Sequence, residues 1–160
     1  MKIYLAGDHA GFELKKALAL HLATLGYEVE DLGPATLDPE DDYPDYAALL
    51  AARIASEAGT RGILVCGTGE GEAMVANRTP GIRAAVFYGP MRVTNALEVE
   101  GGKSEDSFDI IRLVRRHNNA NILCIGARFV LATEADEAVR IFLETPFSDA
   151  PRHARRLAKF

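Results

Sequence analysis

Cysteine is scarce in this sequence, long apolar runs are missing, and positive charge is not in excess. Two cysteines among 160 residues are too few for a disulfide framework or a zinc site and are typical of a reducing compartment. No apolar run approaches the roughly 20 residues that span a membrane. The apolar start reaches Asp8 too early for a signal peptide. We therefore expect a cytoplasmic protein that has no membrane partner.

The balance of charge excludes a second class of function. The chain carries 18 Lys and Arg against 23 Asp and Glu, and its net charge is −5. An acidic protein of this kind is not expected to bind nucleic acid over a general surface. Any site for an anion must therefore be a local cluster of Arg and His. With 48% apolar residues, the chain is also long enough for a single domain with its own core, over residues 1–160.

Short apolar runs alternate with segments of helical spacing, which predicts an α/β fold with a parallel sheet covered by helices on both faces. The five expected strands are Lys2–Gly7, Tyr27–Leu32, Gly62–Cys66, Ile82–Tyr88 and Asn121–Gly126. The expected helices are 14–25, Tyr46–Ala58, Glu70–Asn77, Met91–Val99 and Phe108–Arg116, and a last long helix that starts at the capping box Thr133-Glu134-Ala135-Asp136.

One region interrupts this alternation. Gly89–Ala120, between the fourth and fifth predicted strands, is longer than a single crossover needs. Its middle, Glu98–Asp109, contains Gly101-Gly102 and five acidic residues against one lysine, which predicts an inserted, flexible and solvated loop. Long loops inside compact domains are usually either functional or disordered. Both interpretations are open here.

The glycine-rich stretch after the third predicted strand is the strongest candidate for a site. Cys66 is followed by Gly67-Thr68-Gly69-Glu70-Gly71-Glu72. A buried strand that stops at such a turn presents backbone N–H groups, and a following helix adds its dipole, so the turn favours an anion such as a phosphate. Carboxyl ends of parallel strands are also where open α/β sheets bind ligands. A thiol beside two carboxylates indicates proton chemistry on a small phosphorylated molecule.

This turn does not have the spacing of a nucleotide site. Gly67-x-Gly69-x-Gly71 differs from the dinucleotide pattern G-x-G-x-x-G and follows the third strand rather than the first, and no Walker lysine is present. A nicotinamide or nucleotide cofactor is therefore not favoured.

Other polar residues could join the site, and most of them also have a structural explanation. Asp8-His9 follows the first strand at the ligand edge, although Asp is also a preferred helix N-cap. Tyr43 lies in a turn before a helix, where local rules suffice. His117-Asn118 follows two arginines at a helix end; the helix dipole accounts for the arginines but not for the His-Asn pair.

Two basic groups remain. Arg128 follows the fifth strand at the ligand edge. The C-terminal segment, residues 150–160, is basic, and its Arg152 and Arg156 are four apart, so they would share one helix face and could clamp a phosphate. Ordinary surface charge on a solvated tail explains this segment equally well.

Taken together, the motifs resemble the ribose-5-phosphate isomerase type B family, which also holds galactose-6-phosphate and allose-6-phosphate isomerases. The similarity runs almost from end to end. The motifs that carry it are Gly7-Asp8-His9-Ala10-Gly11, Asp42-Tyr43-Pro44, Cys66-Gly67-Thr68-Gly69, Ala76-Asn77-Arg78, Gly81-Ile82-Arg83-Ala84, His117-Asn118-Asn119-Ala120-Asn121, Gly126-Ala127-Arg128 and Arg152-His153.

The resemblance implies a Rossmann-like three-layer α/β/α sandwich and a metal-free, cofactor-free aldose–ketose isomerisation of a sugar phosphate through a cis-enediolate. The active site would form at the interface of a homodimer, or of a tetramer. The glycine loop would then hold the enediolate oxygens rather than the phosphate. The catalytic residues implied are Cys66, Glu72, Thr68 and His117, and the substrate-binding residues are Asp8, His9, Tyr43, Gly67, Gly69, Glu70, Gly71, Asn77, Asn118, Arg128, Arg152, His153 and Arg156.

The chain departs from this family in two places. One branch uses the cysteine at the position of Cys66 as its base and another uses a glutamate at the position of Glu72, whereas this chain carries both. Ordinary pKa values are about 8.5 for Cys and about 4.3 for Glu, so Glu72 is ionised at neutral pH without help and is the favoured base. The segment Glu98–Asp109 is the second departure, and we interpret it as a lid or an extension of the dimer interface.

The expected substrate is ribose 5-phosphate, with a tetrose, allose or galactose phosphate as alternatives. A non-catalytic sugar-phosphate-binding protein is a different class, and the intact Cys66, Glu72, Thr68 and His117 argue against it because a binder needs no base. A redox role for Cys66 is a third class, but no second cysteine lies near it in the sequence.

Overall fold

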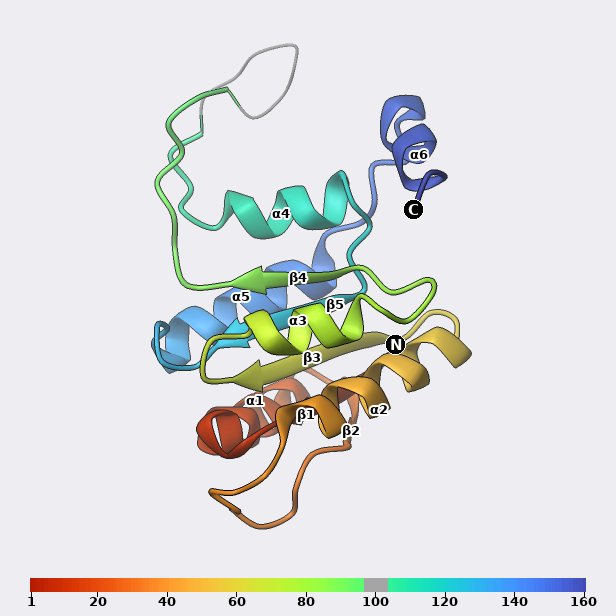
Figure 1. Cartoon of the computed structure of the whole chain (residues 1–160). Coiled ribbons are helices and arrows are strands. Elements are labelled where there is room, and N and C mark those ends of the chain that lie inside the picture. Colours follow the sequence, from red (N-terminus) through yellow and green to blue (C-terminus); the bar gives the residue numbers. More distant parts are fainter. Residues whose placement is uncertain (97–103) are drawn as a thin grey trace.

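The computed structural model describes residues 1–96 and 104–160 and confirms the α/β class (Figure 1). All five strands are parallel and lie in the order β2-β1-β3-β5-β4. The strands are β1 (Lys2–Gly7), β2 (Glu28–Asp31), β3 (Arg61–Cys66), β4 (Ala84–Phe87) and β5 (Ile122–Gly126). The helices are α1 (Phe12–Thr24), α2 (Tyr43–Ser56), α3 (Glu70–Ala76), α4 (Asp109–Arg116), α5 (Ala132–Glu144) and α6 (Pro151–Leu157), and a 3-10 turn covers His9–Gly11.

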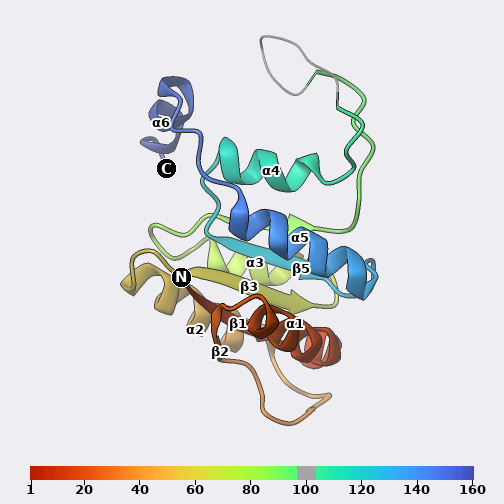
Figure 2. The ribbon, with the colours of Figure 1, turned by 180° about the vertical axis from the view of Figure 1, so that it is seen from behind.

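Helices cover both faces of the sheet, so the fold has the three predicted layers. Apart from Lys2 and Arg61 at their amino ends, the central strands β1, β3 and β5 consist of buried and mostly apolar residues, as expected for strands that are covered on both faces. Ile3 and Leu5 face one core with α1, α4 and α5, while Tyr4 and Ala6 face the other with α2 and α3. Figure 2 shows α1 and α5 in front of the sheet from the opposite side. Within the described ranges, no helix is both long and apolar enough to cross a membrane.

The predicted helix Met91–Val99 is wrong over the part that the structure describes. Residues 91–96 adopt no regular structure, and most of their side chains are exposed, so they have no apolar face to bury. The N–H of Met91 donates instead to the carbonyl of Ser107 at 2.8 Å, which pairs the outgoing segment with the returning one. The rest of this helix and of the predicted Glu98–Asp109 loop, up to residue 103, lies outside the described residues.

The capping box of the last long helix is also placed two residues too late. Helix α5 starts at Ala132, and the Glu134 carboxylate accepts the N–H of Leu131 at 2.8 Å. Leucine has no oxygen to complete the box, so only its glutamate half exists. The predicted basic C-terminal segment does form a helix, α6, which places Arg152 and Arg156 one turn apart.

The course of α5 and α6 decides where this basic segment lies. Helix α5 runs antiparallel to the strands, so the chain that leaves it returns to the edge of the sheet where the strands begin. Both views show α6 on that side, beside the C-terminal end of α4 and away from the arrowheads of the strands (Figures 1 and 2). We call this the amino edge of the sheet, and the opposite side the carboxyl edge.

Candidate active site

The loop between β3 and α3 is built as the sequence predicts. Gly69 has a φ of +79°, a left-handed conformation that favours glycine, and a side chain there would also meet Val86 at 3.1 Å. This turn brings the N–H of Gly69 to 3.3 Å from the Cys66 sulfur. Thr68 lies exposed at the tip of the turn, and its hydroxyl oxygen faces the N–H of Glu70 at 3.4 Å. The thiol therefore sits at the base of a turn whose polar groups face the carboxyl edge.

Glu72 lies completely buried in the first turn of α3. Its side chain is 0% exposed, and neither carboxylate oxygen has a hydrogen-bond partner in the described part of the chain. Burial raises the pKa of this carboxyl far above its usual range, and the negative charge of Asp8 adds to the shift, whereas the nearby Cys66 side chain lowers it. A buried carboxyl without a hydrogen-bond partner lowers the stability of the fold, so the presence of Glu72 at this position indicates a role in chemistry rather than in packing.

Cys66 is held more firmly in its neutral form. Burial raises the pKa of its thiol, and the charge of Glu72 raises it further, against a smaller opposite effect of the Gly69 and Thr68 backbone. The thiol starts about 4 pH units above a carboxyl. Because contact between the two groups raises the pKa of the thiol and lowers that of Glu72, the carboxyl loses its proton first. Glu72 is thus the group that can act as a base near neutral pH.

The carboxyl ends of β1 and β5 supply the neighbours of this loop. One Asp8 oxygen accepts the N–H groups of Ala10 and Gly11 at 3.0 and 3.2 Å, so the residue does cap the 3-10 turn. The Arg128 guanidinium lies against the backbone of Gly67, where an added side chain would meet it at 3.2 Å. Asp8 and Arg128 thus flank the glycine loop from its two sides.

Three further predicted residues join this edge. The His9 ring contacts Asp41, and its Nδ1 lies 2.7 Å from the Asp41 Oδ1. The ring of Tyr43, the first residue of α2, packs against Gly71, where a side chain would meet it at 2.6 Å. The hydroxyl of Tyr88 donates to Glu70, so Glu70 is tied to the end of β4 at the rim.

A second group of predicted residues lies at the amino edge. His117 follows the last residue of α4, and its ring packs on that of His153 with 4.1 Å between centroids. His153 is 3% exposed, whereas Asn118 and Arg156 are exposed. Arg115, also buried, donates to Asn119 Oδ1 at 3.0 Å and to the carbonyl of Thr145 at 3.1 Å. It therefore joins the loop that carries His117 to the segment that leads into α6.

A chain of hydrogen bonds fixes the tautomer of His153. The Ser148 hydroxyl donates its only proton to the carbonyl of Arg116 at 2.7 Å, so at 2.9 Å it must accept from His153 Nδ1. Arg152 Nε, which always carries a proton, lies 3.1 Å from His153 Nε2 and donates to it. The ring therefore has its proton on Nδ1, and both ring nitrogens are engaged inside the chain.

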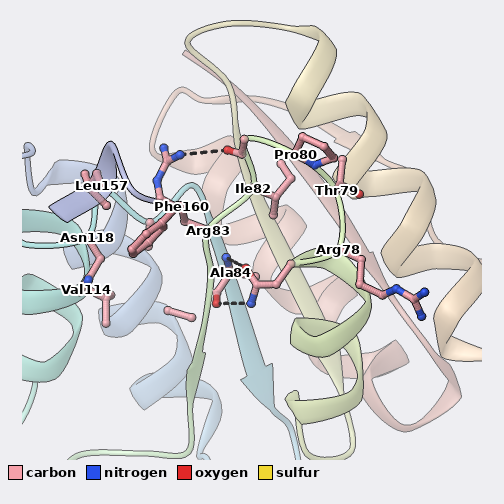
Figure 3. A pocket seen from close by; sticks show the side chains of 14 residues that line it. Arg78, Thr79, Pro80, Ile82, Arg83, Ala84, Val114, Asn118, Leu157 and Phe160 are labelled. Atoms are coloured by element: carbon pink, nitrogen blue, oxygen red, sulfur yellow. Dashed lines mark hydrogen bonds between the residues drawn. The ribbon is translucent and has the colours of Figure 1, made fainter. Parts of the chain in front are cut away.

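Asn77 belongs to the amino edge as well. Its side-chain amide donates to the carbonyl of Ala84 at 3.0 Å and accepts the N–H of Ala84 at 2.8 Å, which fixes the start of β4. A cleft of about 850 Å³ opens beside it. Figure 3 shows Leu157 and Phe160 on one side of this cleft and Arg78 and Thr79 on the other.

A single chain does not bring the two groups together. The carboxyl edge holds Asp8, His9, Tyr43, Cys66, Gly67, Thr68, Gly69, Glu70, Gly71, Glu72 and Arg128. The amino edge holds Asn77, His117, Asn118, Arg152, His153 and Arg156. Strand β5 has five residues, so the two edges are about 16 Å apart at a rise of roughly 3.3 Å per residue. Figures 1 and 2 show α6 and the C-terminal end of α4 on the side of the sheet away from the arrowheads of the strands.

Sequence reasoning missed two residues. Neither Asp41 nor Ser148 is among the residues that the sequence singles out as candidates for the site. No local pattern marks either of them: Asp41 acts on His9, 32 residues away, and the contact of Ser148 with His153 depends on the turn that leads into α6. In residues 1–96 and 104–160, no cluster of three or more His, Cys, Asp or Glu side chains could hold a metal ion.

Comparisons with known proteins assign the family. A model of the "Ribose/Galactose Isomerase" family matches residues 3–102 and 105–160. A probable ribose-5-phosphate isomerase B from Mycoplasma pneumoniae is 40% identical over 98% of this chain and 91% of its own length. The crystal structure of ribose-5-phosphate isomerase B from Mycoplasma genitalium with bound ribulose-5-phosphate is 38% identical, with a TM-score of 0.84 over 99% of this chain and 92% of that one.

A ribose 5-phosphate isomerase structure from Thermotoga maritima is 42% identical, with a TM-score of 0.83 over 99% of this chain and 95% of that one. The similarity thus covers the layers, the strands and both groups of predicted site residues. This chain belongs to the ribose/galactose isomerase family.

Proposed function

We propose that this protein interconverts ribose 5-phosphate and ribulose 5-phosphate. The observation that carries the proposal is the buried, unpartnered Glu72 beneath a glycine loop, in a chain whose relatives are named ribose-5-phosphate isomerase B. One of these relatives was crystallised with ribulose-5-phosphate bound. A carboxylate whose pKa lies above its usual range, next to a loop of N–H donors, suits a reaction that moves a proton between neighbouring carbons.

Glu72 is the base in this proposal. It removes the proton from C2 of the open-chain aldose, and the electron pair moves to the C1 oxygen to give the enediolate. The N–H groups of Gly67–Gly71 stabilise that charge, and loss of one such donor typically costs roughly 3–4 kcal/mol. The Thr68 hydroxyl helps to move a proton between the two oxygens, and Glu72 returns its proton to C1. Cys66 stays a neutral thiol in this proposal, and its contact with Glu72 lowers the pKa of that carboxyl.

The proposed active unit is a homodimer in which each site takes residues from both chains. Its support is the separation of about 16 Å between the two edges, which leaves Glu72 of one chain out of reach of its own Arg152 and Arg156. His117 of the second chain would open the furanose ring, with Asn118 beside it. Arg152 and Arg156 would bind the phosphate, and His153 would hold Arg152 in place, because its ring nitrogens are already engaged.

The test is the appearance of ribulose 5-phosphate from ribose 5-phosphate with EDTA present. Turnover that is insensitive to EDTA supports both the substrate and the metal-free reaction. Parallel assays with tetrose, allose and galactose phosphates decide between the alternatives, since turnover of one of these at a much higher kcat/KM would move the assignment. Binding of these phosphates without any turnover would contradict the enzyme and support a sugar-phosphate-binding protein.

A further inference from the structure

The Asp41 carboxylate contacts both the ring and the backbone of His9, although one of these contacts would be enough to hold the loop. Its Oδ1 lies 2.7 Å from the ring nitrogen Nδ1 and also accepts the backbone N–H of His9 at 3.1 Å. The Asp41 side chain is only 5% exposed. Its other oxygen, Oδ2, is buried and makes no hydrogen bond of good geometry in the described part of the chain, although the Tyr46 side chain lies close to this carboxylate. A carboxylate is thus kept out of water with one oxygen directed at a single residue.

The structural alternative is that Asp41 only tethers its own loop, residues 32–42, to the turn that follows β1. The bond to the His9 backbone would achieve that by itself, and it would work equally well with an asparagine. The shorter contact to the ring is the part that needs a carboxylate, because hydrogen bonds between ionised partners are shorter and stronger. The geometry therefore favours an effect on the imidazole.

The charges around His9 determine what that effect is. Asp41 raises the pKa of the His9 imidazole, and the carboxylate of Asp8 adds to the shift, whereas Arg128 lowers it. Because Nδ1 gives its proton to Asp41, a neutral ring presents only the Nε2 lone pair to a ligand. The cation presents an N–H there instead. An anion can therefore bind at Nε2 only while the ring is protonated.

We propose that Asp41 is a positioning residue that fixes the rotamer of His9 and keeps its ring cationic, so that Nε2–H binds the phosphate monoester of the substrate. The inference rests on the proposed function for the identity of that ligand. Asp41 itself touches no substrate, and it acts only through His9. Affinity for a phosphate should fall as the pH rises through the raised pKa of His9, and loss of Asp41 should move that fall to lower pH.

The decisive experiment follows the His9 ring by NMR over a pH series and measures binding of inorganic phosphate in the same samples. In the wild-type protein, His9 should titrate above its ordinary pKa of about 6.5. In Asp41→Asn it should titrate at lower pH, and phosphate should bind roughly tenfold more weakly at neutral pH. The KM for ribose 5-phosphate should rise in parallel, with little change in kcat.

Asp38→Asn is the matched control. Asp38 lies in the same loop, is exposed, and only accepts the N–H of Glu40, so its change removes the same charge without touching His9. It should leave the His9 titration and phosphate binding unchanged. In a His9→Ala background, Asp41→Asn should cause no further loss of phosphate binding, since the two residues act as one unit.

Three outcomes would overturn the inference. They are a wild-type His9 that titrates at or below about 6.5, an unchanged titration in Asp41→Asn, and full additivity of the two substitutions. The first needs no variant, so it remains decisive even if Asp41→Asn fails to fold. These outcomes are distinct from a failure of the proposed function, because a protein without isomerase activity can still have a His9 imidazole with a raised pKa.

Discussion

The two edges of the sheet differ in charge and in construction. The carboxyl edge carries the carboxylates Asp8, Asp41, Glu70 and Glu72 around tight turns, and one of them is completely buried. The amino edge is built around arginines, and its histidine His153 is engaged through both ring nitrogens. The carboxyl edge carries the proposed base Glu72 together with His9, whereas the amino edge carries the two arginines that we propose bind the phosphate, Arg152 and Arg156. In the homodimer that we propose, each edge supplies half of a site, and the other half comes from the second chain.

Removal of the proposed base at the carboxyl edge should have the largest effect on activity. We expect Glu72→Gln to lower kcat by at least roughly 10²-fold, the usual range for loss of a general base, while Cys66→Ala lowers it much less. The reason is that the carboxyl loses its proton before the buried thiol. Steady-state kinetics on both variants measures the ranking. The opposite ranking would assign the base to Cys66.

Loss of a phosphate-binding residue at the amino edge should act on KM instead of kcat. Arg152→Ala removes a guanidinium that donates to a charged ligand, and such bonds contribute about 1.5–3 kcal/mol, so KM should rise roughly 10- to 100-fold. The control is Arg155→Ala, an exposed arginine on the same helix, which should leave KM unchanged. An equal fall in kcat with constant KM would place Arg152 in the chemical step.

The buried carboxyl should also cost stability. The folded-state pKa of Glu72 is raised above its unfolded value of about 4.3, so its favourable contribution is complete below that pH and is lost as the pH rises through the folded-state pKa. Glu72→Gln should therefore melt about 5 °C higher than wild type at pH 8 and at the same temperature near pH 4.

Thermal unfolding at both pH values measures this difference. Glu13→Gln, an exposed carboxyl on α1, is the control and should change the melting temperature at neither pH. A Glu72→Gln variant that melts below wild type at pH 8 would show that the buried Glu72 carboxylate stabilises the fold, which contradicts the expected loss of stability.

The smallest effect is expected at Ser148. Ser148→Ala removes the acceptor of the His153 Nδ1 proton and frees the ring to change tautomer, which loosens Arg152. We expect KM to rise about threefold, consistent with one neutral hydrogen bond, with kcat unchanged. Ser56→Ala, at the exposed end of α2, is the control. A rise in KM as large as that of Arg152→Ala would mean that Ser148 contacts the substrate.

The sequence predicted the layers and the strands well because buried parallel strands are apolar at every position, as in Ile63-Leu64-Val65. It failed over residues 91–96, where the Met91–Ser107 pairing is made with a distant segment that local spacing does not reveal. The glycine loop could be predicted from the sequence because its conformation depends on a local feature, the left-handed turn that favours glycine at position 69. Asp41 and Ser148 could not, because their partners are 32 and 5 residues away and only the fold brings them together.

A mixed-subunit experiment tests the central claim most directly. Glu72→Gln and His117→Ala are each expected to be almost inactive, and they affect opposite edges. If each site takes its base from one chain and His117 from the other, equal mixing gives hybrid dimers with one intact site. In a symmetric dimer this restores roughly a quarter of the wild-type activity. Mixtures that stay inactive after verified subunit exchange would contradict a site shared between two chains.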